Sequence, residues 1–425
     1  MSRSVMSPST TQRTRVLLMA TSMRGGGSEH QVALLAEHLP RDRFDVHLYL
    51  THAEGVLLER IPGDVRIHSW SHGVGSDSSG RSGIERLLDR WPGTILRRQA
   101  LDFAEIVNRE WIDVIYDRAF HNTMIAGHPS IRGLVRARRV STIVSPPHVA
   151  LPMVEKRFVG AKRRLLADAY RRSDQVIAVS SVAADSAARY YGLPREQIAV
   201  VANPVDVDEV RKTAGVPREV PPSGEPANQP VSTPSRAELR LVCVGRMTPE
   251  KGQADLVEAI GMLPSGWPEG LRERLVVRFI GDGPNRRALE TRWRQICRAD
   301  GTVDGHRAEF VGAISPAVCE IARADGLVLP SHFEGMPNVV LEAFALGVPV
   351  VATRSGGTVD LQADPSCPTC FWAEPGDPAS IAKALWEFAE DPQRREGHVR
   401  AAGELIRGDH AIGRAIERIG GFLHG

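Results

Sequence analysis

Residues 326–353 read GLVLPSHFEGMPNVVLEAFALGVPVVAT, and this stretch decides the expected fold. It opens on a short apolar run that is typical of a buried strand, and a loop with Glu334 and Gly335 follows. Pro337 suits the first position of a helix, where its missing N–H costs no hydrogen bond, and Gly347 suits the helix end. A second apolar run closes the stretch. The order of strand, loop, helix and strand predicts a parallel sheet that helices cover.

The same stretch carries two carboxylates around a helix start. Glu342 lies roughly one turn inside the predicted helix, and the first N–H groups, at Asn338 and Val339, form a natural anion site. Ionised carboxylates only accept hydrogen bonds, which suits the hydroxyl groups of a sugar or a ribose. We therefore expect a phosphate-sized anion to bind between Glu334 and Glu342.

This pattern resembles the signature of the retaining glycosyltransferases of family 4, which have the GT-B fold. The family has two glutamates separated by seven residues, in the context E-G-x-P-N-x-x-L-E-A-x-A-x-G-x-P-V-V-A. The resemblance implies that Glu342 holds the ribose of a nucleotide and that Glu334 approaches hydroxyls of the transferred sugar. It implies donor-binding roles for Gly335, Met336, Asn338 and Val339 as well. The matching positions are Glu334, Gly335, Pro337, Asn338, Leu341, Glu342, Ala343, Ala345, Gly347, Pro349, Val350, Val351 and Ala352.

Two other loops of the second half resemble family motifs. Residues 245–252, GRMTPEKG, are similar to the G-R-x-x-x-x-K-G turn, in which Arg246 and Lys251 neutralise a diphosphate. In the family these cations stabilise the departing diphosphate, so we expect no metal ion in the reaction. A solvated surface pair is the alternative for them. Residues 281–284, GDGP, resemble the family's loop near the base. The donor-binding residues expected in these loops are Gly245, Arg246, Lys251 and Gly283.

The first half opens on a glycine run after its first predicted strand. Residues 25–29, GGGSE, resemble the G-G-x-E loop of the family's first domain. We expect Gly26 and Gly27 to allow close approach to a donor phosphate or to the acceptor. The dinucleotide fingerprint G-x-G-x-x-G fails here, because Glu29 and His30 stand where its last glycine would fall.

Two histidines at strand ends are candidates for the reaction centre. His121 follows the strand predicted at 112–116, where family members often carry a histidine that reaches the donor sugar, and His148 is its rival. We expect His121 to act in catalysis with Glu334, Arg246 and Lys251. After the strand that ends at residue 353, the family's G-G-x-x-E pattern ends here in Asp360, whose shorter side chain leaves its role open.

Two domains are expected, because 425 residues exceed what one hydrophobic core usually serves. Strands alternate with helices on both sides of a proline-rich segment at 214–236, and each series predicts a doubly wound, Rossmann-like α/β sheet. The two sheets are expected to face each other across a cleft, as in GT-B proteins. A serine- and glycine-rich loop is expected at 72–84. The expected parts are a flexible tail (1–14), an acceptor-binding domain (15–205), a Pro-rich linker (206–237), a nucleotide-sugar-binding domain (238–400) and a C-terminal helical segment (401–425), for which a return to the first domain is considered.

The net charge of +2 hides an asymmetry between the halves of the chain. Residues 1–203 carry 28 basic and 20 acidic side chains, which leaves 25 basic and 31 acidic ones for the remainder. Basic clusters such as 162–164 predict attraction to anionic lipid or to a phosphate-bearing acceptor, with a solvated basic face as the equal alternative. Nucleic-acid binding is not expected, because aromatic residues make up only 5% and no recognition module is present.

The expected location is the cytoplasm, with the inner face of the membrane as one site of action. No apolar run approaches the roughly 18 residues that a membrane span needs, and the run at 16–20 is too short for a signal peptide. Five cysteines form a poor disulfide framework. Cys367 and Cys370 lie in a proline-containing loop without further ligands, so metal or redox chemistry is not expected there.

The expected function is metal-independent transfer of a hexosyl group, with retention, from a UDP- or GDP-sugar to a hydroxyl acceptor. No cofactor is expected, because the nucleotide sugar is a co-substrate. Synthesis of cell-surface polysaccharide or glycolipid is the expected context, with a lipid-linked acceptor as one option. The alternatives are a sugar-nucleotide epimerase of the same fold and a non-catalytic sugar-nucleotide-binding protein. An NAD-dependent oxidoreductase would rest on the glycine loop alone.

Overall fold

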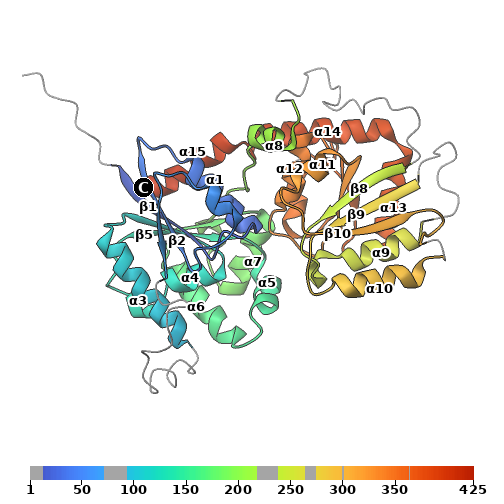
Figure 1. Ribbon diagram of the computed structural model, residues 1–425. Helices are drawn as coiled ribbons and strands as arrows, with labels where there is room; N and C mark the ends of the chain where they lie inside the picture. Colours follow the sequence, from blue (N-terminus) through green and yellow to red (C-terminus); the bar gives the residue numbers. More distant parts are fainter. Residues whose placement is uncertain (1–12, 71–92, 218–237, 264–273, 299–300, 363) are drawn as a thin grey trace, which may run out of the picture. The chain divides into compact units, whose positions relative to one another are not determined.

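The computed structural model describes residues 13–70, 93–217, 238–263, 274–298, 301–362 and 364–425, which form two compact units (Figure 1). The first unit holds the chain up to Ala178, with Ala184–Val201 and Ile416–Gly425, and the second holds Val179–Ala183 and Ala202–Ala415. The loop predicted at 72–84, almost all of the predicted tail and most of the predicted linker lie outside the described residues.

A seven-stranded parallel sheet forms the centre of the first unit, in the order β3-β2-β1-β4-β5-β6-β7. Its inner strands are almost entirely buried runs of apolar residues, as expected for a parallel sheet that helices cover on both faces. The edge strand β3 was not predicted, because three of its four residues are polar and most of them are exposed. The strands are β1 (Thr14–Ala20), β2 (Phe44–Leu50), β3 (Arg66–Ser69), β4 (Val114–Arg118), β5 (Arg138–Ile143), β6 (Gln175–Ala178) and β7 (Ile198–Val200).

The helices of the first unit include one from the far end of the chain. The ring of His424, in that last helix, meets the ring of Phe44 edge to face at 6.4 Å, and Arg138 Nη2 donates to the Phe422 carbonyl at 3.4 Å. The α-helices are α1 (Gly27–His38), α3 (Thr94–Arg109), α4 (Phe120–Ala126), α5 (Pro147–Val154), α6 (Val159–Arg171), α7 (Ser181–Tyr191) and α15 (Ile412–His424). The first residues of α7 and α15, 181–183 and 412–415, belong to the second unit. Short 3-10 turns add Val56–Arg60, Pro129–Ile131 and Arg195–Gln197.

A six-stranded parallel sheet forms the centre of the second unit, in the order β10-β9-β8-β11-β12-β13. The strands are β8 (Glu238–Val244), β9 (Arg274–Ile280), β10 (Arg307–Gly312), β11 (Gly326–Leu329), β12 (Val350–Thr353) and β13 (Phe371–Ala373). The α-helices are α8 (Val207–Ala214), α9 (Gln253–Gly261), α10 (Arg286–Ile296), α11 (Val318–Ala322), α12 (Asn338–Leu346), α13 (Pro378–Glu390) and α14 (Pro392–Arg407), with 3-10 turns at Pro249–Lys251 and Gly356–Leu361. None of the helices among the described residues combines the length and apolar character that crossing a membrane requires.

Two predicted boundaries are wrong. The predicted linker starts in α8, which Asp206 caps through a hydrogen bond from the Glu209 N–H at 3.0 Å. This helix belongs to the second unit, where the buried Arg211 donates to the Ala345 carbonyl at 3.0 Å. The boundary predicted at residue 400 falls inside α14, and the change of unit comes only at residues 415–416.

Each sheet has one point at which its strand order reverses. Doubly wound sheets bind ligands there, outside the carboxyl ends of the strands, because neighbouring loops diverge to opposite faces. In the first unit the point lies between β1 and β4, and in the second between β8 and β11. Two apolar clusters bury the strands of the second sheet, and each fully buried large side chain in them contributes about 1.5–3 kcal/mol.

His398 in α14 is a buried titratable group with a predictable effect on stability. Its side chain is 3% exposed and lies against the ring of Phe371, and neither ring nitrogen has a hydrogen-bond partner among the described residues. Burial lowers the pKa of His398 to about 4. Since an unfolded histidine titrates near pH 6.5, only the unfolded chain takes up this proton between pH 6.5 and 4. The free energy of unfolding therefore falls as the pH drops through this range.

We predict that His398→Leu reduces this loss by up to roughly 1.4 kcal/mol per pH unit below pH 6.5. Near pH 7 the variant should be at least as stable as the parent, because a buried polar group without partners is removed. Urea unfolding at pH 7.5 and pH 5 measures both effects, with the exposed His52→Leu as control. Equal pH dependence in the parent and in His398→Leu would contradict this prediction.

Candidate active site

Two charged residues from separate predicted motifs meet at the reversal point of the second sheet. Lys251 Nζ donates to Glu334 Oε1 at 2.7 Å, and Ser331 Oγ donates to the same oxygen at 2.8 Å. The side chains of Lys251 and Glu334 are only 24% and 11% exposed. A hydrogen bond between such charged groups contributes about 1.5–3 kcal/mol. The loops after β8 and β11 are therefore joined by a largely buried ion pair.

Glycines let the loops around this pair pack backbone against backbone. A Cβ on Gly252, where φ is +65°, would lie 1.9 Å from the Pro330 carbonyl oxygen. On Gly356, with φ of +57°, it would lie 2.1 Å from the Glu334 carbonyl oxygen. The same carbonyl accepts a hydrogen bond from the Gly357 N–H at 2.9 Å. The turn after β12 thus fixes the backbone that carries Glu334.

One face of helix α12 is partly exposed near the start of the helix. Asn338, Val339 and Glu342 are half-buried, whereas the remaining residues of the helix are buried. Their spacing of three and four residues places them on one face of the helix. Pro337 is the N-cap of the helix, whereas it was predicted as the first helical residue; the helix begins at Asn338. The helix carboxylate therefore shares a face with the helix N-terminus.

Asn203 supports this helix start and was not predicted as a site residue. Its Nδ2 donates to Asn338 Oδ1 at 2.9 Å and to the Met336 carbonyl at 3.4 Å, and its side chain is buried. His410 Nδ1 lies 2.8 Å from the Asn203 carbonyl oxygen. Residues 203–206 read NPVD and stand only where the composition of the sequence changes. An asparagine next to a proline after an apolar run was the available signal.

Arg246 and Lys251 engage different carboxylates instead of forming one cationic pair. The Arg246 guanidinium is 77% exposed and lies 3.8 Å from Glu250 Oε1. The backbone of its loop is tied to the loop after β9, because the Met247 N–H donates to the Asp282 carbonyl at 2.8 Å. The Gly283 N–H donates to Asp282 Oδ1 at 2.7 Å.

Gly245 is fixed in the same way, because its N–H donates to the Ile280 carbonyl at 2.9 Å. The predicted glycines therefore hold the loops that surround Lys251.

Asp360, whose role the sequence left open, caps a helix. Its two carboxylate oxygens accept hydrogen bonds from the Ser181 N–H at 2.6 Å and from Ser181 Oγ at 2.5 Å. Ser181 is the first residue of α7. The shorter side chain at this position thus has a structural partner in the second unit.

At the reversal point of the first sheet, Glu29 holds the glycine loop. Its Oε2 accepts from the N–H groups of Gly25 and Gly26, each at 2.8 Å, and its Oε1 accepts from Ser22 Oγ. The Gly26 N–H therefore donates its hydrogen bond within its own loop. Gly26 is the N-cap of α1 and Gly27 its first residue, so both lie where the loop turns into the helix.

His121 lies at the same reversal point, in the first turn of α4. Arg118 Nε, at the end of β4, donates to Ser28 Oγ in α1 at 3.2 Å, which joins the two loops. Burial lowers the pKa of His121, so its imidazole is neutral near pH 7. His148 is exposed, and its Nδ1 lies 2.6 Å from Ser186 Oγ in α7.

Two family models match the chain. Residues 25–209 match the model described as Glycosyltransferase Family 4, and residues 238–391 match the model described as Glycosyl transferases group 1. Together they contain every predicted site residue of both units.

The curated relatives are similar to the chain over part of their length. The D-inositol 3-phosphate glycosyltransferase of Streptomyces avermitilis is 32% identical over 232 residues, which are 54% of this chain and 47% of that protein. The glycogen synthase of Mycobacterium tuberculosis is 28% identical over 247 residues, which are 56% of this chain and 51% of that protein. The chain thus spans about half the length of the curated relatives it matches.

Solved structures are similar over nearly the whole chain. HepE of Anabaena, in complex with UDP-glucose, has a TM-score of 0.68 at 18% identity, covering 97% of this chain and 99% of that one. Sucrose-phosphate synthase of Thermosynechococcus elongatus has a TM-score of 0.70 at 17% identity, covering 96% and 98%. At such identities the likeness shows the fold, and the prediction of two parallel-sheet α/β domains of the GT-B type is confirmed.

We predict that Gly356→Ala destabilises the second unit more than Gly376→Ala. Both glycines have positive φ, +57° and +73°, so both alanines meet the same backbone strain of about 1 kcal/mol. Only the Cβ at residue 356 meets backbone atoms, since nothing lies within 4 Å of the one at residue 376. Urea unfolding should show an additional loss of at least about 1 kcal/mol for Gly356→Ala. Equal losses would mean that the turn after β12 does not fix the Glu334 loop.

Proposed function

Because the chain belongs to the family 4 (group 1) glycosyltransferases, we propose that it transfers a sugar from a nucleoside-diphosphate sugar to an acceptor hydroxyl, with retention. The observation that carries this proposal is the ion pair of Lys251 and Glu334 beside the start of α12, at the reversal point of the second sheet. That arrangement supplies a cation, an anion-binding helix start and a second carboxylate to one ligand.

The donor is proposed to bind along the strand ends of the second unit. The ribose hydroxyls donate to the Glu342 carboxylate, and the diphosphate accepts from N–H groups at the start of α12. Lys251 and Arg246 balance its charge, and Glu334 accepts from sugar hydroxyls. A UDP-sugar is favoured over a GDP-sugar, because the similar structure of HepE was solved with UDP and with UDP-glucose.

In the proposed reaction, the bond between the sugar C1 and the diphosphate oxygen breaks as the acceptor oxygen bonds to C1 from the same face. The acceptor proton passes to the departing phosphate. Negative charge grows on the diphosphate in this step, and the ammonium of Lys251 is already positioned by Glu334 and needs no reorganisation. Neutral His121 is proposed to contact the sugar near the reaction centre.

The two glutamates are not an acid and base pair in this scheme. They hold the ribose and the sugar of one donor, which differs from the paired carboxylates of glycoside hydrolases. Arg246 and Lys251 supply the positive charge that a metal ion provides to the diphosphate in other enzymes.

We predict that Glu342→Ala weakens UDP binding by about 10- to 100-fold, the equivalent of one lost hydrogen bond to a charged group. Titration calorimetry with UDP measures the effect. Glu404→Ala is the control, because Glu404 is an exposed helix carboxylate of the same unit. Unchanged UDP affinity in Glu342→Ala would contradict the ribose role.

Incubation with UDP- and GDP-sugars tests the reaction itself. Release of the nucleotide with formation of a glycosylated acceptor supports transfer. Release of a free sugar without a glycosylated acceptor would favour the epimerase. Binding without turnover would favour a sugar-nucleotide-binding protein.

An apolar and basic segment of the first unit supports a lipid-linked acceptor at an anionic membrane. Val154 and Phe158 are 67% and 61% exposed, although both are apolar. The side chains of Lys156 and Arg157 between them are exposed as well, and Arg164 follows on α6. Apolar side chains that insert at the headgroup level, next to cations, are typical of interfacial binding.

We predict that the protein floats with anionic vesicles at low salt and is released at high salt, because exposed charges are screened. The variant Val154→Ser/Phe158→Asn should lose this binding. Asparagine is chosen at residue 158 because it tolerates the positive φ of 56° there. Trp111→Ser, which removes a 75% exposed aromatic residue elsewhere in the unit, should float like the parent. No flotation of the parent at low salt would contradict the membrane role.

A further inference from the structure

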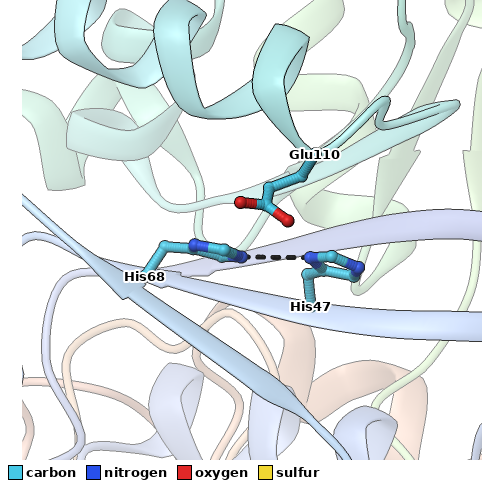
Figure 2. A group of neighbouring side chains, drawn as sticks. All are labelled: His47, His68 and Glu110. Carbon is cyan, nitrogen blue, oxygen red and sulfur yellow. Dashed lines mark hydrogen bonds between the residues drawn. The ribbon is translucent and has the colours of Figure 1, made fainter.

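Two histidines and a glutamate lie together in the first unit, apart from the strand-end loops described above (Figure 2). His47 lies in β2, His68 in the edge strand β3, and Glu110 directly after the last residue of α3. His47 Nδ1 and His68 Nε2 are 3.0 Å apart, and one ligand atom from each of the three residues lies within 4.8 Å of the others. Figure 2 shows the Glu110 carboxylate directed at the two rings.

Strand register and helix length bring these residues together. Side chains alternate along a strand, so His47 and Tyr49 share one face of β2, and His68 joins them because it pairs with Tyr49. Helix α3 covers this face, where the Phe103 ring meets the Tyr49 ring at 5.1 Å. The carboxylate of Glu110 therefore arrives over the histidines where α3 ends.

Of the two positions for the ring proton of His47, the contacts favour Nε2, which leaves Nδ1 without a proton. His47 is fully buried, and its Nε2 lies 3.8 Å from Asp45 Oδ2 without a hydrogen-bond partner among the described residues. If Nδ1 carried the only proton, two acceptors, Nε2 and the Asp45 carboxylate, would face each other. With the proton on Nε2, an N–H points at Asp45 and the lone pair of Nδ1 points at His68.

We propose that His47, His68 and Glu110 bind a divalent transition-metal ion of the zinc class. Three protein ligands from imidazole and carboxylate, with a water at the fourth position, form a common tetrahedral zinc site. Zinc–nitrogen bonds of about 2.0–2.1 Å place two tetrahedral nitrogens about 3.3 Å apart, so the rings need to separate by only a few tenths of an ångström. Asp45 then serves as the outer carboxylate that orients His47.

Two arginines compete with the ion for the carboxylates. Arg109 Nε lies 3.0 Å from Glu110 Oε1, and Arg66 lies 3.3 Å from Glu110 Oε2 and 3.7 Å from Asp45 Oδ2. Both arginine side chains are at least 60% exposed, so they can turn into solvent when the ion binds. The ion joins the edge strand β3 to the end of α3, and its role is to stabilise the first unit. It is separate from the proposed donor site.

The test uses the full chain without a histidine tag, stripped with EDTA and titrated with ZnCl₂ under reducing conditions. Calorimetry should show one site that is lost in His68→Ala and in Glu110→Gln. Zn²⁺ should raise the unfolding temperature of the parent but not of these variants, because an ion that binds only the folded state stabilises it. Co²⁺ in the parent should give the visible absorption of a tetrahedral site. Asp45→Asn should weaken binding by about 10- to 100-fold.

The controls separate this site from surface binding and from misfolding. His38→Ala removes an exposed histidine of the same unit and should bind Zn²⁺ like the parent, whereas Arg109→Gln should bind it more tightly. Affinity for UDP should be unchanged in every variant, which reports on the fold and keeps this test independent of the donor site. No zinc uptake by the parent, or equal uptake by Glu110→Gln, would overturn the proposal and leave only a hydrogen-bonded pair of neutral histidines.

Discussion

The ion pair of Lys251 and Glu334 is the interaction on which the proposed donor site depends. A carboxylate that is 11% exposed is costly to bury without a partner, and Lys251 Nζ at 2.7 Å is that partner. The pair joins loops 83 residues apart in sequence, after two neighbouring strands. It can form only because Gly252 brings these loops into backbone contact and Gly356 supports the far side of Glu334. A diphosphate at this position would give Lys251 a second anionic partner without moving it.

Some carboxylates near the strand ends of this protein hold the backbone and others are proposed to bind the donor, and a sequence motif does not separate the two groups. Glu334 and Glu342 are half-buried and follow β11, at the reversal point of the second sheet. Glu29 and Asp360 also lie in motifs that resemble those of the family, but they accept hydrogen bonds from the backbone N–H groups of Gly26 and Ser181. Glycine-rich turns leave N–H groups that no strand or helix satisfies, and a nearby carboxylate satisfies them. The same residue types therefore build the loops and supply the groups proposed to contact the ligand.

The architecture was predictable because its signals are local. Apolar runs of strand length, glycines at turns and the motif at 326–353 predicted the α/β fold and the loops that follow β8, β9 and β11. Features that depend on distant residues were not predictable. The edge strand β3 has a single apolar residue, Ile67, and therefore no apolar period, and the prolines that follow α8 obscured its helical pattern. The bond from Asn203 to Asn338 spans 135 residues, and no local pattern contains it. The roles proposed for His121, Glu334 and Glu342 rest on the family resemblance.

The position of α15 has a consequence for how the protein is made. Residues 416–425 complete the first unit, in which His424 packs against Phe44 across most of the chain. The second unit needs nothing beyond residue 415. Domains usually fold in order from the amino end during synthesis. Here the second unit can finish folding before the first, in which Phe44 stays uncovered until the last residues are made. The order of completion is thus the reverse of the order of synthesis. Losing the last ten residues would expose an apolar edge of the first unit and would remove no part of the second.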